Sequence, residues 1–417
     1  MKFEPIPHRN FLFLQGPPGP FFWQLSERLR ELECGIFRIN LNGGDQADWT
    51  GEATNYRGTR RKWTLFIDRF LSDNAITDVI LFGDCRPLHV AAHRMAHLRK
   101  IDVHVFEEGY IRPDWLTLEP SGVNGHSSLP RDPKWYLEEA RSLPLLPDRP
   151  AITASFRRRA RDAFYYYSRV FLTRPLFPFY QSHRRGSLFL EGLGWLRRFA
   201  TENRESRRTA KLVDSLDRQP YFLFPLQLSN DYQIREHSPF QDMVEAVDYV
   251  IYSFAHRAPS NALLVIKEHP LDASFTNWRG RIAELARRCS VTDRIVHIDG
   301  GDLSKLAVSS CGMVTVNSTS ATLALAAGIP TIALGKAIYN IMGITHQGRL
   351  DDFWARPHAP DRAIYDAFRR VLYDRCLIYG GLASESAVHT LVESAVERLV
   401  GDRISHWASA PVDGIVS

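Results

Sequence analysis

Residues 76–106 read ITDVILFGDCRPLHVAAHRMAHLRKIDVHVF, and this stretch decides the fold class. It opens with a largely apolar run over 76–82, which is typical of a parallel strand that is buried on both faces. Helical spacing follows over 88–98, and a second apolar run over 102–106 predicts the next strand. A strand, a helix and a strand in this order predict an α/β protein whose parallel sheet carries helices on its faces.

The same alternation extends through the rest of the chain. Further strand-like runs occupy residues 10–14, 35–41, 221–226, 262–266, 295–298, 313–316 and 331–334. Further helical patterns occupy residues 21–32, 60–71, 363–372 and 384–400. Ser238 and Pro239 resemble the N-cap and first position of another helix, which reaches about Ala258. Two such doubly wound sheets predict two Rossmann-like domains that face a central cleft.

The composition is that of an ordinary folded protein with two domains. The chain has 417 residues, of which 44% are hydrophobic and 24% charged, and domains usually contain 100–200 residues. We expect a first Rossmann-like domain at 1–150 and a second Rossmann-like domain at 213–380. A linker or membrane-facing segment at 151–212 would join them, and a helix and tail at 381–417 would follow.

The cysteines and the apolar stretches indicate a cytoplasmic protein. The five cysteines lie far apart and form no CxxC pair, which argues against a zinc cluster or a disulfide framework. The first ten residues contain no apolar core of signal-peptide length. The longest uncharged stretch, 306–335, is interrupted by glycine, proline and polar residues. We therefore expect this stretch to be part of a folded core rather than a membrane span.

The segment 157–211 is strongly basic and aromatic. It contains 14 Arg or Lys, 4 Asp or Glu and 11 aromatic residues, whereas the whole chain has a net charge of only +5. Arginine and aromatic rings together suit an anionic membrane surface. A linker whose rings pack on a neighbouring domain, or a nucleic-acid surface, would have the same composition. The composition favours the membrane or the linker over nucleic acid.

Candidate binding motifs follow the strands of the first half. Ligands of open α/β sheets bind outside the carboxyl ends of the strands. LQGPPGPFF (14–22) follows the first strand, and its glycine spacing fits neither a dinucleotide fingerprint nor a P-loop. It is therefore either an anion-binding helix start or a plain turn. NLNGGD (40–45) follows the second strand. In FGDCRPLH (82–89), Asp84 and Arg86 are either site residues or helix caps.

The motif FEEGYIRPDWLTLEPSGVNGHSSLP (106–130) places two carboxylates at the end of a strand. Because neighbours on a strand point to opposite faces, we expect only one of Glu107 and Glu108 to face the cleft. We select Glu108, which could act as a nucleophile or a general base. Glu107 should tolerate substitution better. Alternatively, both carboxylates are solvated or pair with Arg112.

The second half contains two motifs that suit a phosphate. In IKEHP (266–270), Lys267 and His269 share one face and Pro270 ends the strand. In VNSTSATLALAAGIP (316–330), polar residues end a strand and open a helix, where hydroxyls and backbone N–H groups favour an anion. An ordinary Ser/Thr cap would have the same pattern. The polar residues of this turn are Asn317, Ser318, Thr319 and Ser320.

Together these motifs resemble the KpsS/LipB-type capsular polysaccharide proteins of Gram-negative bacteria, over most of the chain. The second half contributes FPLQLSNDYQIREHSPF and a motif that continues to IALG at residue 335. The resemblance implies a GT-B-like architecture. It also implies transfer of Kdo (3-deoxy-D-manno-octulosonic acid) from CMP-β-Kdo, with retention, to lysophosphatidylglycerol. The product would be the poly-Kdo linker on which the capsule is built and exported.

The resemblance also implies roles for single residues. On the pattern of GT-B sialyltransferases, His269, Pro270, Ser318 and Thr319 would hold the nucleotide. Related KpsC-type transferases carry Glu-Asp-Gly where this chain has Glu107-Glu108-Gly109, so Glu108 would be the nucleophile. The further candidates are Asp84 for catalysis, Lys267, Asn317 and Ser320 for the nucleotide, and Gln15, Gly16, Arg86 and Arg112 for the substrate.

No cofactor or metal is expected, because no DxD-like motif ends a strand. The implied partners are CMP-Kdo, the lipid acceptor, the inner face of the cytoplasmic membrane, a KpsC-type transferase and the capsule exporter. Nucleic acid is not among them. Two other hypotheses stay open. One is a different GT-B-type enzyme, such as a UDP-sugar transferase or epimerase, and the other is a non-catalytic glycolipid-binding protein of capsule export.

Overall fold

The computed structural model describes residues 9–152, 155–182, 208–210, 212, 213, 216, 219–228, 232–270, 272 and 276–401. The chain forms two compact units. The first comprises Met1–Ser128, Leu146–His183 and Leu372–Ser417, and the second comprises Leu129–Leu145 and Arg184–Val371. The part of the basic segment at 183–207 and the tail at 402–417 lie outside the described residues.

This division differs from the expected domain boundaries in three places. Residues 129–145 belong to the second unit, where Tyr136 of α5 (Pro133–Glu139) packs on Phe368 of α14 (Arg362–Val371) with 5.5 Å between ring centroids. Residues 372–401 return to the first unit and end in a helix on its sheet. Residues 155–182, which we expected in a separate linker, belong to the first unit as well.

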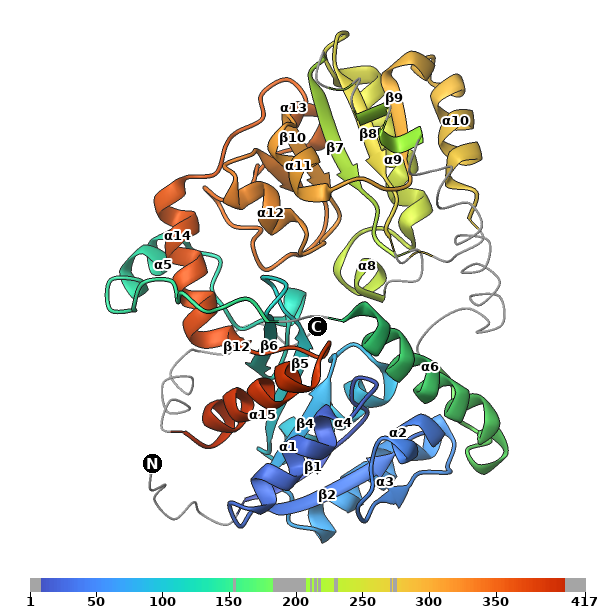
Figure 1. Cartoon of the computed structure of the whole chain (residues 1–417), viewed down its shortest axis with the longest axis vertical. Coiled ribbons are helices and arrows are strands. Elements are labelled where there is room, and N and C mark those ends of the chain that lie inside the picture. Colours follow the sequence, from blue (N-terminus) through green and yellow to red (C-terminus); the bar gives the residue numbers. More distant parts are fainter. Residues whose placement is uncertain are drawn as a thin grey trace. The chain divides into compact units, whose positions relative to one another are not determined.

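The first unit contains a seven-stranded sheet among its described residues, with the strand order β12-β6-β5-β4-β1-β2-β3 (Figure 1). Its strands are β1 (Asn10–Phe13), β2 (Gly35–Asn40), β3 (Thr54–Asn55), β4 (Asp78–Phe82), β5 (Asp102–Glu108), β6 (Trp115–Pro120) and β12 (Leu377–Tyr379). Its helices are α1 (Phe21–Arg30), α2 (Gly43–Ala47), α3 (Arg60–Asp73), α4 (Pro87–Leu98), α6 (Phe156–Leu172) and α15 (Glu385–Val400).

The predicted α/β alternation is confirmed, but the prediction of a wholly parallel sheet is wrong at one side. Strands β1 to β5 pair in parallel, whereas β6 pairs antiparallel with β5 and β12 antiparallel with β6. Only residues 109–114 separate β5 from β6. Such a short connection can return only antiparallel, because a parallel crossover needs a dozen or more residues.

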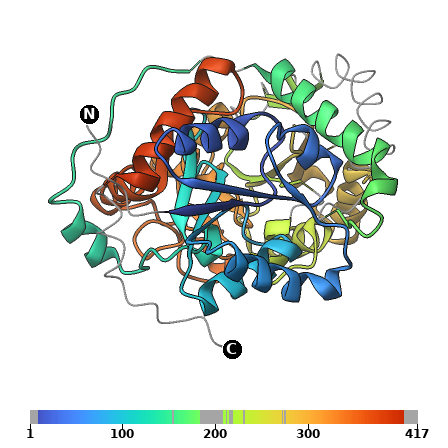
Figure 2. The same cartoon turned by 90° about the horizontal axis from the view of Figure 1, so that it is seen from below.

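Helices cover both faces of this sheet, which Figure 2 shows from below. Alternate residues of the strands point to opposite faces. Phe11 and Phe13 of β1 pack with α1 and α15, while Leu12 between them packs with α3 and α4. The long apolar helix at the end of the chain thus completes a layer of the first unit, rather than forming a separate tail domain.

The second unit contains a five-stranded, all-parallel sheet among its described residues, in the order β11-β10-β7-β8-β9 (Figure 1). Its strands are β7 (Tyr221–Pro225), β8 (Leu263–Lys267), β9 (Ile295–Ile298), β10 (Gly312–Thr315) and β11 (Thr331–Ala333). Its helices are α5 (Pro133–Glu139), α8 (Tyr232–His237), α9 (Met243–Arg257), α10 (Trp278–Arg288), α11 (Leu303–Val308), α12 (Ala321–Ala326), α13 (Leu350–Phe353) and α14 (Arg362–Val371).

The helix that we predicted to begin at Ser238 and Pro239 begins later. It starts at Met243, and the side chain of Asp242 caps it by accepting the Glu245 N–H at 3.0 Å. The Ser238 hydroxyl instead donates to the Ile234 carbonyl at 2.5 Å and accepts the Phe240 N–H at 3.2 Å. Ser238 therefore closes the preceding helix rather than opening the next one.

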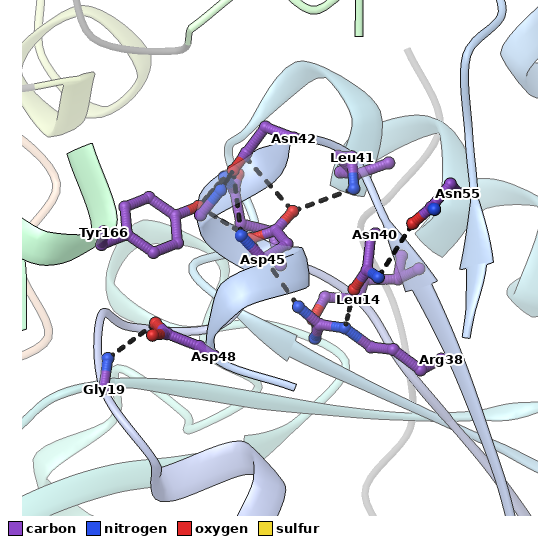
Figure 3. Close-up of polar contacts among 12 residues, drawn as sticks. Leu14, Gly19, Arg38, Asn40, Leu41, Asn42, Asp45, Asp48, Asn55 and Tyr166 are labelled. Atoms are coloured by element: carbon purple, nitrogen blue, oxygen red, sulfur yellow. Dashed lines mark hydrogen bonds and ion pairs between the residues drawn. The ribbon is translucent and has the colours of Figure 1, made fainter. Parts of the chain in front are cut away.

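Helix α6 lies against α2 in the first unit. A Cβ atom on Gly44 would lie 2.6 Å from the Tyr166 ring, and one on Gly43 would overlap the Thr173 hydroxyl oxygen. The Tyr166 hydroxyl donates to Asp45 Oδ1 at 2.7 Å (Figure 3). It accepts the amide N–H groups of Gln15 at 2.7 Å and Asn42 at 3.0 Å. The two glycines of the NLNGGD motif thus allow α6 to approach this closely.

No helix among the described residues is long and apolar enough to cross a membrane.

The contact between α2 and α6 gives a first prediction. Gly44→Ala should destabilise the protein by about 1–3 kcal/mol, because the added methyl group must push the Tyr166 ring out of a packed position. The measurement is the shift of the thermal unfolding midpoint. Gly381→Ala is the matched control in the same unit, since its Cβ would meet its nearest neighbour, Ala387, at 3.7 Å. Equal midpoints for the two variants would contradict the packing account.

Candidate functional site

Four parallel strands of the first unit end at one edge of the sheet, and each is followed by candidate residues. Gln15 and Gly16 follow β1, Asp84 and Arg86 follow β4, and the two carboxylates end β5. The NLNGGD motif starts in β2 and continues into α2. Because these strands are neighbours in the sheet, the candidates collect along one edge. Arg86 connects two of the groups, as its guanidinium donates to the Gln15 carbonyl at 3.5 Å.

The Glu107 side chain points from β5 toward the turn that follows β4. Its Oε2 would be 3.4 Å from a Cβ on Gly83, and the Arg86 Nε would be 3.7 Å from the same point. Glu107 Oε1 accepts the N–H of Glu108 at 3.0 Å. Burial raises the pKa of Glu107 to about 7, against the effect of that hydrogen bond. Near neutral pH this carboxyl group therefore exists in both protonation states.

Glu108 points to other partners than Glu107, as the alternation along β5 predicts. Its Oε1 accepts a hydrogen bond from Arg159 Nη2 at 2.7 Å, so α6 supplies an ion pair to the end of β5. Burial alone would raise the pKa of Glu108, but the charges of Arg159 and Arg112 lower it below its ordinary value. Arg112 also donates to the Gly109 carbonyl at 3.4 Å. Glu108 is thus held as the anion.

Asp84 holds the loop that follows β6. This buried carboxylate accepts the Val123 N–H at 3.1 Å, the His126 ring N–H at 3.0 Å and the Cys85 thiol at 3.1 Å. Burial favours the neutral acid, but these hydrogen bonds bring the pKa of Asp84 below its ordinary value. Asp84 lies at the expected edge, and its contacts are those of a residue that positions a loop.

Two of the expected substrate-binding residues are engaged in packing. The Gln15 side chain is buried, and its amide donates to the hydroxyls of Tyr166 and Tyr180 at 2.7 and 3.1 Å. A Cβ on Gly16 would lie 2.7 Å from the ring of Phe22, so this glycine allows close packing in the turn. The backbone of both residues lies at the edge of the sheet. The Gln15 side chain and the space beside Gly16 are used for packing within the protein.

Sequence reasoning missed several buried polar residues at this edge. Arg38 is buried, donates to the Leu14 carbonyl, and lies 3.7 Å from Asp45 (Figure 3). Glu119 is fully buried between the hydroxyls of Tyr110 and Ser127, and burial raises its pKa to about 7. Glu119 lies inside the long motif, which was the available signal. Arg38 lies within a strand and offered no local signal.

In the second unit, the two phosphate motifs follow β8 and β10, which end at the same edge of the parallel sheet. Lys267 is the last residue of β8 and is buried, with its ammonium group donating to the Glu268 carbonyl at 3.4 Å. His269 and Pro270 follow the strand end, so His269 lies beyond the strand rather than on its face. Strand β7 separates β8 from β10, which leads to Asn317.

Gln227, which sequence reasoning did not single out, holds the first residue of the turn after β10. It follows β7, accepts the Asn317 N–H at 3.0 Å, and donates to the Asn317 side-chain oxygen at 2.9 Å. Asn317 also donates to the Gln233 carbonyl at 2.9 Å. The Asn317 amide therefore fixes the turn before α12. The backbone N–H of Leu226 in turn donates to the Lys267 carbonyl at 2.8 Å.

The hydroxyls of the turn after β10 face one another. The Ser318 and Ser320 oxygens lie 2.8 Å apart, and the Ser320 N–H donates to the Ser318 oxygen at 3.2 Å. Helix α12 has only six residues, and no side chain caps it by a hydrogen bond. The expected contribution of a helix dipole is therefore small, and the hydroxyls of Ser318, Thr319 and Ser320 are the groups that could meet a phosphate.

One group in the second unit has the residue types of a metal site. His297 Nε2 lies 2.9 Å from Glu268 Oε1 and 3.6 Å from Asp299 Oδ1. Arg279 also pairs with Asp299 at 2.8 Å. Arg279 therefore places a positive charge beside this group, which gathers at the ends of β8 and β9.

Comparison with known proteins places this arrangement in a family. Residues 77–381 match the family model described as capsule polysaccharide biosynthesis protein. The capsule polysaccharide export protein KpsS of Escherichia coli is 34% identical over 374 residues, which cover 87% of this chain and 94% of that protein. The capsule polysaccharide modification protein LipB of Neisseria meningitidis serogroup A is 32% identical, with coverage of 90% and 92%.

Among solved structures, the β-Kdo 2,7-transferase of Thermosulfurimonas dismutans KpsC aligns with a TM-score of 0.44 at 15% identity, covering 92% of this chain and 99% of that one. The family match and the two relatives extend over most of the chain, so the similarity is not limited to a single motif. This chain belongs to the capsule polysaccharide biosynthesis protein family.

Proposed function

We propose that this protein is a retaining β-Kdo transferase that moves Kdo from CMP-Kdo to a lysophosphatidylglycerol-type lipid at the inner face of the cytoplasmic membrane. Its product would begin the poly-Kdo linker for capsule export. Membership in the capsule biosynthesis family supports the substrate class. The single observation that carries the reaction type is the pair of adjacent carboxylates at the end of β5, of which Glu108 meets Arg159 while Glu107 accepts a backbone N–H.

In the first step, a carboxylate oxygen of Glu108 attacks the anomeric carbon C2 of Kdo. The bond from C2 to the phosphate oxygen breaks, and CMP leaves with the electron pair. A nucleophile must be ionised to do this, and the charges of Arg159 and Arg112 favour the ionised form of Glu108. The result is a covalent Kdo–enzyme ester with inverted configuration.

In the second step, a hydroxyl of the lipid acceptor attacks C2, and the bond between C2 and Glu108 breaks. Configuration at C2 inverts again, which gives overall retention. We assign the acceptor proton to Glu107, because a general base works best with a pKa near the operating pH. Two neighbouring carboxylates with different environments can divide such roles. On this proposal Glu107 tolerates substitution less well than the strand alternation predicts.

The cytidine phosphate is assigned to the edge of the second sheet. His269 can donate to a phosphate oxygen, and the hydroxyls of Ser318 and Thr319 add neutral donors. Lys267 contributes positive charge at the same edge. Arg86 and Arg112 remain the candidates for the Kdo carboxylate.

Helix α6 and the residues after it support a membrane-bound acceptor. Large apolar side chains are well exposed there, and Phe164 is 76% exposed. The others in this group are Tyr165, Phe171, Leu172, Leu176 and Phe179. Arg157, Arg161, Arg169 and Arg174 are exposed in the same segment. Exposed rings and arginines together suit the headgroup region of an anionic bilayer.

The two carboxylates give a second prediction. With CMP-Kdo alone, the wild-type protein should form a Kdo ester that intact-protein mass spectrometry and peptide mapping place on Glu108. Glu108→Gln should fold, bind CMP and form no ester. Glu107→Gln should form the ester but transfer Kdo to lipid about 10²–10⁴-fold more slowly, because only the second step needs the base.

The raised pKa of Glu107 adds a pH signature to this prediction. Wild-type transfer to lipid should fall as the pH decreases through about 7, because protonation removes the base. Formation of the ester from the donor alone should lack this decrease. A Kdo ester on another acid, or full transfer activity in Glu108→Gln, would refute the assignment.

The donor site gives a third prediction. His269→Ala should weaken CMP binding about tenfold or more, because a charge-assisted hydrogen bond contributes about 1.5–3 kcal/mol. Calorimetric titration with CMP measures this change, and titration with UDP separates a CMP-specific site from a UDP-sugar enzyme. His256→Ala on α9 is the control. CMP affinity that is unchanged in folded His269→Ala would remove His269 from the site.

The exposed face of α6 gives a fourth prediction. The protein should sediment with vesicles that contain anionic lipid and dissociate at high salt. Replacement of Phe164, Phe171 and Leu172 by Ser should weaken this binding at least tenfold. Leu65→Ser combined with Leu98→Ser is the control, because both leucines are exposed on other helices. Equal sedimentation of the two variants would contradict a membrane role of α6.

A further inference from the structure

We propose that Arg159 is a positioning residue that fixes the place and the charge of the Glu108 carboxylate, which makes α6 part of the catalytic apparatus. This proposal rests on the proposed function, because it gives Arg159 a role in the first chemical step. The carrying observation is the 2.7 Å hydrogen bond from Arg159 Nη2 to Glu108 Oε1. The two residues come from different elements, 51 positions apart in the chain.

The rest of α6 is attached so that Arg159 has a defined position. The N-cap residue Ser155 donates its N–H to the Ala383 carbonyl at 3.0 Å, next to the start of α15. Two turns beyond Arg159, the Tyr166 hydroxyl makes three hydrogen bonds to residues that follow β1 and β2. The backbone at Arg159 thus lies between two anchored points of one helix, within reach of the end of β5.

The neighbouring carboxylate shows what burial does at this place when a nearby arginine, here Arg86, lowers the pKa less than burial raises it. Glu107 adjoins Glu108 in the chain, and burial raises its pKa to about 7. The charged groups that face Glu108 from the described elements are Arg159 of α6, Arg112 of the loop after β5, and Glu107 itself. The two cations therefore favour the ionised form of Glu108, whereas burial and the neighbouring carboxylate oppose it.

The expected effect is moderate, because solvent reaches this ion pair. The side chains of Arg159 and Glu108 are 45% and 27% exposed, so water screens part of their attraction. Arg112 also stays in place when Arg159 is removed. We therefore expect the loss of Arg159 to move the ionisation of Glu108 part of the way toward that of Glu107.

Helix α6 offers a matched control for the charge of Arg159. Arg161 lies on the same helix, is 70% exposed, and pairs with its neighbour Asp162 at 3.3 Å. Removal of either arginine takes one positive charge from the proposed membrane face. Only Arg159 contacts Glu108, so a defect that is specific to Arg159 cannot come from weaker membrane attraction.

The test measures how fast the Kdo ester forms on the full-length protein with CMP-Kdo alone, from pH 5.5 to pH 8, by intact-protein mass spectrometry. Lipid is left out, so neither membrane binding nor the base Glu107 enters the rate. The proteins are wild type, Arg159→Ala, Arg159→Lys and Arg161→Ala. Thermal unfolding verifies that each variant is folded.

The wild type and Arg161→Ala should form the ester at nearly the same rate over this pH range. Arg159→Ala should be about fivefold slower at pH 6 than at pH 8, because a raised pKa leaves more Glu108 protonated as the pH decreases. Arg159→Lys, which keeps the charge, should restore most of the rate at pH 6. Rescue by lysine and a changed pH profile would not follow from a purely structural contact.

Two failures are distinguishable. A pH profile of Arg159→Ala that superimposes on that of the wild type, in proteins that form the ester, would overturn the positioning role and leave the proposed function intact. Absence of a Kdo ester from the wild-type protein, or an ester on another acid, would overturn the role of Glu108 and this proposal with it. If Arg159→Ala does not fold, the Arg159→Lys variant decides. A wild-type pH profile in this variant supports the proposal, and a rate about fivefold lower at pH 6 than at pH 8 overturns it.

Discussion

The Tyr166 hydroxyl is the contact that joins α6 to the ends of two strands of the first sheet at once. It donates to Asp45 and accepts from Gln15 and Asn42, so one oxygen connects the ends of β1 and β2 to the helix. Gly43 and Gly44 are required for this approach, because side chains there would occupy the space of Thr173 and Tyr166. The position of Arg159, and with it the environment of Glu108, depends on the attachment of this helix.

The chemistry follows from the unequal surroundings of two adjacent carboxylates. Glu107 points toward Gly83 and Arg86, where burial dominates, while Glu108 meets the guanidinium of Arg159. Alternation along a strand is sufficient to separate their environments. Helix α6, which carries exposed aromatic rings, supplies the guanidinium of Arg159 to Glu108. The same helix would thus serve a lipid acceptor and the nucleophile.

Short-range patterns predicted most of the fold and part of the site. The apolar runs at β4 and β5 and the polar residues after them are local features, and their common edge follows from parallel pairing. The hydrogen bond from Gln15 to Tyr166 joins residues 151 positions apart, so no local pattern contains it. The same is true of the Arg159–Glu108 pair, the return of α15 to the first sheet, and the antiparallel strand β12. The glycines of NLNGGD were noticed as a loop motif, but their role in packing α6 needed the three-dimensional partner.

The most direct test of the central claim is the reaction itself. Purified protein is incubated with CMP-Kdo and lysophosphatidylglycerol, and the lipid is analysed by mass spectrometry and NMR. The account predicts lipid heavier by one or more Kdo residues, the first joined to the glycerol by a β-linkage, together with release of CMP. Lipid of unchanged mass, recovered with a protein that binds CMP and the lipid, would contradict it.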